Sequence, residues 1–155
     1  PMFNRSINGL YSPGSTIKQL VAINAVKNKV IDLETSYFAG PFFQLPTSSR
    51  RYRDWKPEGH GEVNLQKAIE QSCDVYFYML ANNLGIKKLS SFFKHFSFGE
   101  KTGIDLPYES SGVLPSEDWK LKNIGYKWTD GDTIILELGK DTFYQLLCNL
   151  YMLQA

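Results

Sequence analysis

Ser15 and Lys18 have the residue types and the spacing to act as a nucleophile and its base. They follow the turn-forming pair Pro13-Gly14, and apolar residues at helical spacing come next, so a helix is predicted from about Ser15 to about Asn28. Side chains three residues apart meet on one face of a helix, here at its positive end. A neutral lysine there could accept the proton of an attacking serine hydroxyl. The alternative is a capping serine followed by a solvated lysine.

A second polar pair, Ser72 and Asp74, lies between two predicted helices. The first is short and follows Asn64, a favourable N-cap residue, and the second is a strongly apolar helix from Val75 to Leu84. A side chain at such an interruption can point into a cleft instead of packing between helices. Taken alone, the pair could equally cap the helix that begins at Val75.

The rest of the sequence is rich in glycine and proline and predicts long connections. Residues 29–63 and 97–133 show no sustained period, so both are predicted as loops, and loops of this length are often functional. The remaining patterns predict an amphipathic helix at 89–96, a short helix starting at 115–119, a strand at 134–138 and a helix at 144–153.

The composition is that of a globular protein and argues against several classes of function. Seventeen basic and 16 acidic residues give a net charge of +1, so nothing in the charge balance points to nucleic acid. Two cysteines, Cys73 and Cys148, are too few for a disulfide framework. No apolar run reaches the roughly 20 residues of a membrane-spanning helix. A chain of 155 residues can bury a core of its own.

Together with their surroundings, the two polar pairs resemble the penicillin-binding D,D-transpeptidases of bacterial cell-wall synthesis. The likeness is greatest to the elongation-specific class B enzymes of the penicillin-binding protein 2 subgroup and extends over residues 4 to about 138. It is carried by residues 9–18, 52–56, 59–61, 72–78, 102–107, 111–115, 128 and 131–133. The resemblance implies the α/β penicillin-recognising fold, in which helices surround a five-stranded antiparallel sheet. This chain is expected to cover its helical middle, with little of the sheet.

The resemblance also implies a role for each of the four polar residues. Ser15 would attack the carbonyl of a D-Ala-D-Ala stem peptide or of a β-lactam, and its backbone N–H would supply one arm of an oxyanion hole. Lys18 would take the serine proton, and Ser72 would relay a proton to the leaving group. Asp74 stands where many members of the family carry Asn, whereas the penicillin-binding protein 2 subgroup carries Asp there. An ionised Asp cannot donate a hydrogen bond, as Asn can.

The same resemblance implies the setting of the whole enzyme. Acyl transfer of this kind needs no cofactor. The partners would be peptidoglycan stem peptides, β-lactam antibiotics and the cell-elongation machinery, with no nucleic acid. The location would be the periplasmic face of the bacterial inner membrane, with the membrane anchor outside this chain.

The family's third motif is expected beyond residue 155. Lys101-Thr102-Gly103 spells this motif, but it lies in a predicted loop and not on a strand, so we do not assign it that role. Residues 1–155 are therefore expected to be a partial transpeptidase domain that is not acylated by itself. From about Glu137 the sequence departs from the family pattern, which we interpret as a shift of reading frame.

Asp54, His60 and Cys73 are candidate ligands of a structural zinc ion, since thiolate, imidazole and carboxylate all bind Zn²⁺. In the family fold the segment with Asp54 and His60 belongs beside Cys73. Ala39 stands where similar chains can offer an Asp, so a fourth ligand is missing. The alternative is a buried free cysteine beside a hydrogen-bonded histidine.

Two other functions remain open from the sequence. A serine β-lactamase or β-lactam sensor would share the Ser15-x-x-Lys18 chemistry, although no additional base for deacylation can be identified. The second possibility is a catalytically inert fragment that keeps a structural zinc site.

Overall fold

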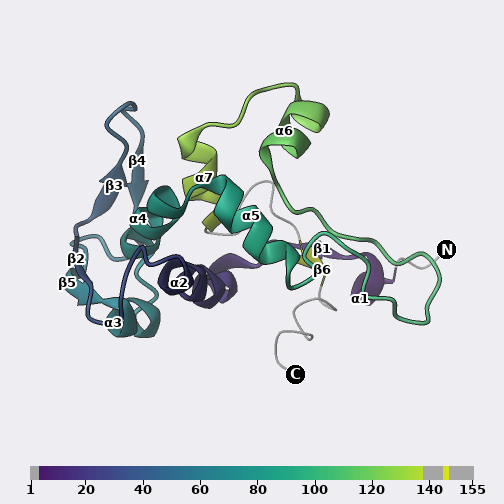
Figure 1. Ribbon diagram of the computed structural model, residues 1–155, viewed down its shortest axis with the longest axis horizontal. Coiled ribbons are helices and arrows are strands. Elements are labelled where there is room, and N and C mark those ends of the chain that lie inside the picture. Colours follow the sequence, from purple (N-terminus) through teal and green to yellow (C-terminus); the bar gives the residue numbers. More distant parts are fainter. Residues whose placement is uncertain (1–3, 138–144, 147–155) are drawn as a thin grey trace.

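The computed structural model describes residues 4–137 and 145–146 of the chain. Its centre is a pair of packed helices, α2 (Lys18–Lys27) and α4 (Asp74–Leu84). Helix α5 (Ile86–Lys94) contacts both of them (Figure 1). The predicted helices at these positions are confirmed, with the difference that Ser15 lies in a 3₁₀ turn just before α2.

Helix α4 is the most deeply buried element of the protein. Its sequence is apolar on nearly all sides, and a helix of that kind is stable only when neighbours cover it all round. The neighbours are α2, α5, α7 and the small sheets. Its buried side chains are Val75, Tyr76, Phe77, Tyr78, Leu80, Ala81 and Leu84. The first residue of α4 is therefore held firmly in place.

The segment predicted as a loop at 29–63 contains four short strands, which corrects the prediction. Strand β2 (Ser36–Ala39) pairs antiparallel with β5 (Gly61–Asn64), and β3 (Phe42–Gln44) pairs antiparallel with β4 (Arg51–Arg53). Strands of three or four residues are too short to show an alternating pattern, and the partner of β2 is distant in sequence. In Figure 1 both pairs lie at the same end of the molecule, beside α4 and α3.

The predicted strand at 134–138 is also wrong where the structure describes it. Residues Asp130–Glu137 form helix α7, which packs against α4. A short run of β-branched residues cannot by its period be told from one turn of a buried helix. The buried faces of Thr133, Ile134 and Leu136 show that packing against α4 decided the outcome.

The two short helices predicted after Asn64 and at 115–119 each begin at a residue whose side chain caps the helix. Asn64 accepts a hydrogen bond from the backbone N–H of Lys67 at the start of α3 (Leu65–Glu70). Ser116 accepts one from the backbone N–H of Trp119 at the start of α6 (Glu117–Ile124). Both helices were predicted, and both are confirmed.

The N-terminal part leads into the 3₁₀ turn η1 (Gly14–Ile17). It consists of helix α1 (Arg5–Asn8) and strand β1 (Leu10–Tyr11), which pairs antiparallel with β6 (Gln145–Leu146). Apart from these two residues of β6, the predicted helix at 144–153 lies outside the described residues, as does most of the tail after Glu137.

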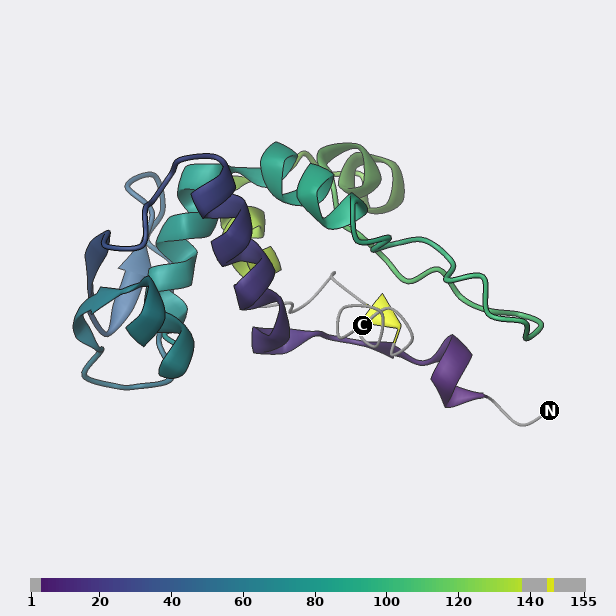
Figure 2. The same ribbon diagram turned by 60° about the horizontal axis from the view of Figure 1, so that its bottom comes forward.

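Between α5 and α6 the chain forms a long arm without helix or strand over most of its length (Figure 2). Glu109 organises part of it, because its carboxylate accepts hydrogen bonds from the backbone N–H groups of Thr102 and Gly103 and from the Thr102 hydroxyl. Lys101-Thr102-Gly103 therefore lies in a loop and not on a strand, as predicted. No helix in the described part of the chain is both long and apolar enough to span a bilayer.

Candidate active site

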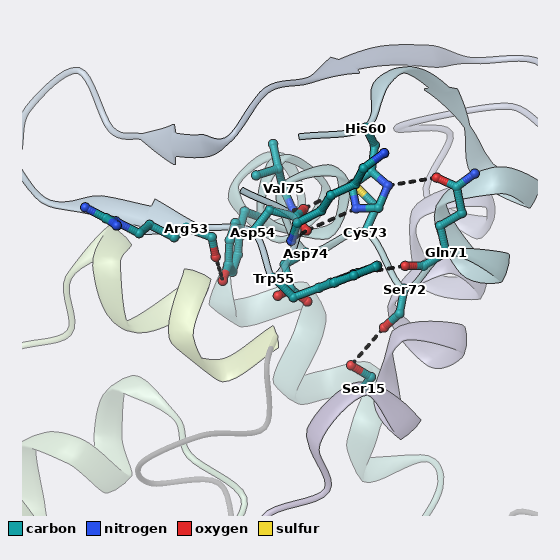
Figure 3. Close-up of polar contacts among 12 residues, drawn as sticks. Ser15, Arg53, Asp54, Trp55, His60, Gln71, Ser72, Cys73, Asp74 and Val75 are labelled. Atoms are coloured by element: carbon teal, nitrogen blue, oxygen red, sulfur yellow. Dashed lines mark hydrogen bonds and ion pairs between the residues drawn. The ribbon is translucent and has the colours of Figure 1, made fainter. Parts of the chain in front are cut away.

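The structure brings together the four side chains that the sequence singled out. The Lys18 Nζ atom lies 2.5 Å from Asp74 Oδ1, 3.1 Å from Ser72 Oγ and 2.9 Å from the Ser72 carbonyl oxygen. The Ser72 Oγ atom lies 3.1 Å from Ser15 Oγ (Figure 3). A continuous hydrogen-bonded path therefore runs from the Ser15 hydroxyl through Ser72 to the Lys18 ammonium.

The four residues lie at helix starts or in the turns next to them. Ser15 lies in η1, Lys18 is the first residue of α2, and Asp74 is the first residue of α4. Ser72 lies in the break between α3 and α4, with a backbone φ of 49° in the left-handed region. Non-glycine residues seldom adopt this conformation, and where they do it is often at a functional site.

The capping alternatives are not seen for either serine. The N-cap residue of α2 is Ile17 and that of α4 is Cys73, and neither N-cap side chain makes a capping hydrogen bond. The hydroxyl groups of Ser15 and Ser72 bond to each other instead. Their positions are thus available for chemistry.

The Lys18 ammonium is nearly enclosed, with its side chain 4% exposed and that of Asp74 14% exposed. The ring of Phe77 lies 5.5 Å from Nζ. An ammonium has three N–H donors, and the contacts to Asp74, the Ser72 hydroxyl and the Ser72 carbonyl account for three. The Lys18 nitrogen is thus held by one carboxylate and two neutral oxygens.

The path opens into a pocket of about 700 Å³. Ser15, Ser72 and Asp74 contribute to its lining. The other lining residues are Trp55, Lys56, His60, Glu70 and Gln71. The sequence pointed to His60 only as a metal ligand, and it did not place the other four in a pocket. Trp55 is 61% exposed, which is unusual for so large an apolar side chain. The only available signal was its place within a segment that resembles the family.

Behind one wall of the pocket, the three candidate metal ligands converge. Ligand atoms of Asp54, His60 and Cys73 all lie within 4.8 Å of one another. His60 Nε2 is 3.1 Å from Asp54 Oδ1, and Cys73 Sγ is 3.4 Å from Asp54 Oδ2. His60 Nδ1 lies 2.7 Å from Gln71 Oε1 (Figure 3). The ring thus turns Nδ1 toward Gln71 and Nε2 toward Asp54.

The side chains of this cluster are buried, and burial affects the pKa values of Asp54 and Cys73. Burial opposes ionisation of Asp54, but backbone N–H groups of Val75 and Lys56 and the His60 ring outweigh it, so the pKa of Asp54 lies below its usual value. Burial raises the pKa of the Cys73 thiol to about 12, and the nearby Asp54 carboxylate adds to the rise. Without a cation beside it, Cys73 is a protonated thiol.

Ala39 lies next to this cluster, as its carbonyl oxygen accepts a 2.8 Å hydrogen bond from the His60 backbone N–H. Its buried methyl group offers no ligand atom. Within residues 4–137 and 145–146, no other His, Cys, Asp or Glu joins the three. Three protein ligands would leave one position of a tetrahedral zinc ion for water.

Comparison with known proteins places this geometry in a family. Residues 1–142 match the family described as the penicillin binding protein transpeptidase domain. The chain is 43% identical over 155 residues to the peptidoglycan D,D-transpeptidase MrdA of Acinetobacter baumannii, covering all of this chain and 23% of that protein. It is 43% identical over 140 residues to MrdA of Escherichia coli, covering 90% of this chain and 22% of that protein.

Solved structures show the same likeness. A crystal structure of Pseudomonas aeruginosa PBP2 in complex with WCK 5153 has a TM-score of 0.93 at 38% identity, over 98% of this chain and 34% of that one. PBP2 of Helicobacter pylori, in its complex with MreC, has a TM-score of 0.88 at 42% identity, over 94% of this chain and 27% of that one. The chain thus spans about a quarter of the length of the curated relatives named above.

Proposed function

Because this chain belongs to the penicillin-binding protein transpeptidase domain family, we propose that it supplies the nucleophile and proton-transfer groups of a peptidoglycan D,D-transpeptidase. The predicted penicillin-recognising fold is confirmed by the structural likenesses, and the chain covers a helix-rich part of it. The observation that carries the proposed function is the hydrogen-bonded path from Ser15 through Ser72 to Lys18.

In the proposed reaction, Ser15 Oγ attacks the carbonyl carbon of the penultimate D-Ala of a stem peptide. The serine proton moves along the path toward Ser72 and Lys18, and a proton passes back to the nitrogen of the departing terminal D-Ala. The product is an ester of Ser15, which the amine of a second stem peptide then attacks to form the cross-link. Each proton taken from a nucleophile is thereby returned to a leaving group.

Lys18 must release a proton before it can accept one. The nearest acceptor is the carboxylate of Asp74, at 2.5 Å. A shift of one proton from Lys18 to Asp74 would turn the ion pair into a neutral amine and a neutral acid. We infer that Asp74 serves as this temporary proton holder, which an Asn at the same position could not do.

The proposed substrates are D-Ala-D-Ala stem peptides, and β-lactams would acylate the same serine. The relative from H. pylori was solved together with MreC, and cell-elongation proteins are the proposed partners of this chain's enzyme. The proposed location is the periplasmic face of the inner membrane.

A full-length chimaera provides the test: residues 4–137 of this chain replace the matching segment of A. baumannii MrdA, to which the chain is 43% identical. We expect fluorescent penicillin to label the chimaera and Ser15→Ala to abolish the label. Ser90→Ala on α5 is the matched control and should label normally. Absence of labelling in the folded chimaera would refute the proposal. Rapid loss of the label by hydrolysis would favour the β-lactamase alternative.

We further propose that Asp54, His60 and Cys73 hold a zinc ion. The support is the chemistry of the donor set, the 4.8 Å limit on their separations and the Gln71 contact that directs His60 Nε2 toward the other two. Zinc would supply a structural tie between the segment at 54–60 and the start of α4. It would not take part in acyl transfer.

Metal content provides a direct test, and the two histidines of the chain give a matched pair. We expect the purified chimaera to contain close to one zinc per molecule, His60→Gln and Cys73→Ser to lose it, and His95→Gln to retain it. Replacement by Co²⁺ should give a thiolate charge-transfer band that Cys73→Ser removes. Zinc content near zero in the unchanged chimaera would contradict the proposal.

A further inference from the structure

Ser72 owes its function to a backbone conformation that it would not adopt unaided. Its φ of 49° is in the left-handed region, which costs a non-glycine residue roughly 1 kcal/mol or more. Such a conformation persists only where the surroundings enforce it. The question is which contacts do so, because they also aim the Ser72 hydroxyl at Ser15.

The two peptide planes on either side of Ser72 are each held at both polar ends. In the plane before it, the Ser72 N–H donates to the Ile69 carbonyl at 3.1 Å, and the Gln71 carbonyl accepts from Trp55 Nε1 at 3.0 Å. In the plane after it, the Cys73 N–H donates to the Ala68 carbonyl at 2.9 Å, and the Ser72 carbonyl accepts from Lys18 at 2.9 Å. Because a peptide unit is planar, these four bonds fix the φ and ψ of Ser72.

Only two of the four bonds come from side chains, and Lys18 is already part of the proton path. The other is the indole N–H of Trp55. Its ring is itself fixed in place, since it lies edge-on to His60 with 5.5 Å between the ring centres. His60 is in turn bonded to Asp54 and Gln71. Figure 3 shows the Trp55 ring spanning the space between this cluster and the chain at Gln71 and Ser72.

We propose that Trp55 is a positioning residue for Ser72, acting through the hydrogen bond from its indole N–H to the Gln71 carbonyl. This inference rests on the proposed function, because it concerns the rate at which Ser15 is acylated. It also gives a reason why Trp55, although 61% exposed, is held by a hydrogen bond to the Gln71 carbonyl and a ring contact with His60.

Acylation kinetics of the chimaera with a chromogenic penicillin test the inference. Trp55→Phe keeps an aromatic ring but removes the donor, and it should lower the acylation rate constant roughly 3- to 10-fold, the usual worth of one hydrogen bond. The dissociation constant of the non-covalent complex should stay within about twofold. Trp119→Phe, on α6, is the matched control and should change neither value. If Trp55→Phe folds poorly, Trp55 can instead be replaced by benzothienylalanine, which has sulfur in place of the N–H. The same loss of roughly 3- to 10-fold is expected.

A double-mutant cycle separates positioning from general structural damage. In the Ser72→Ala background, Trp55→Phe should change the remaining acylation rate by less than about twofold, because there is no hydroxyl left to aim. An equal loss in both backgrounds, or no loss with Ser72 present, would overturn the inference while leaving the proposed function intact. A folded chimaera that is not acylated at all would overturn both.

Discussion

The ammonium of Lys18 and the carboxylate of Asp74 form an ion pair of 2.5 Å across a sequence separation of 56 residues. It joins the first residue of α2 to the first residue of α4, the two helices at the centre of the protein. The same contact holds both groups beside Ser72. Stability and the geometry of the proton path therefore depend on one interaction.

Removing the cation alone should be more harmful than removing both charges. Lys18→Met leaves the Asp74 carboxylate without its partner in a largely enclosed site, and we expect a loss of about 3 kcal/mol in the free energy of unfolding of the chimaera. Lys18→Met combined with Asp74→Asn should lose clearly less. Chemical denaturation measures both values, and additive losses would show that the pair does not interact energetically.

Gly59 and Gly61 form a natural pair for testing the backbone of the segment that carries His60. Both have a positive φ, of 77° and 70°. A Cβ at Gly59 would lie 2.4 Å from the Gly40 carbonyl carbon, whereas one at Gly61 meets nothing within 4 Å. Gly61→Ala should cost only the left-handed conformation, about 1–2 kcal/mol. Gly59→Ala should cost a further 1–3 kcal/mol or so. Equal losses in thermal stability would contradict the close approach.

The contact between Asp132 and Lys120 should make stability depend on pH. Burial opposes ionisation of Asp132, but hydrogen bonds from Lys120 and Thr129 outweigh it, so its pKa lies below the ordinary 3.8. A lowered carboxyl pKa stabilises the fold above the unfolded value, and the gain is lost as the pH falls through the folded value. Asp132→Asn should therefore lower stability at pH 7, by less than about 1 kcal/mol since solvent reaches both groups.

That difference should shrink progressively below about pH 4, because the unchanged protein then loses the same interaction. Thermal melts of the two proteins between pH 7 and pH 3 provide the measurement. Asp130→Asn, at the exposed start of α7, is the control and should show a smaller difference. If the stability difference between the unchanged protein and Asp132→Asn did not depend on pH, the difference would not come from the charge of Asp132.

Cys73 should be unreactive in the native protein when no metal is present. Its side chain is fully buried, and burial raises the pKa of the thiol to about 12, so almost no thiolate exists at neutral pH. After treatment with a chelator, iodoacetamide at pH 8 should leave the peptide containing Cys73 unmodified until denaturant is added. Peptide mass spectrometry gives the readout, and rapid alkylation of the folded protein would show that the site is open.

Elements with local signals could be predicted from the amino-acid sequence. Asn64 predicts a helix start because a cap acts on backbone groups two or three residues away. The spacing of Ser15 and Lys18 predicted a nucleophile and a base on adjoining turns, and the apolar run from Val75 to Leu84 predicted a buried helix. Hydrogen bonds within helices connect neighbours in the sequence, so a sequence pattern can reveal them.

Other features depend on contacts with partners elsewhere in the fold and could not be predicted in this way. The strands of residues 36–64 exist because each is paired to another, and the run from Thr133 to Leu136 is helical because α4 lies against it. Residues 52–56 resemble the family, but only the structure shows that the Trp55 indole donates to the Gln71 carbonyl next to Ser72. The left-handed backbone of Ser72 likewise has distant partners, since Trp55 and Lys18 hydrogen-bond to the carbonyl groups on either side of it, and its hydroxyl lies between the Ser15 hydroxyl and the Lys18 nitrogen.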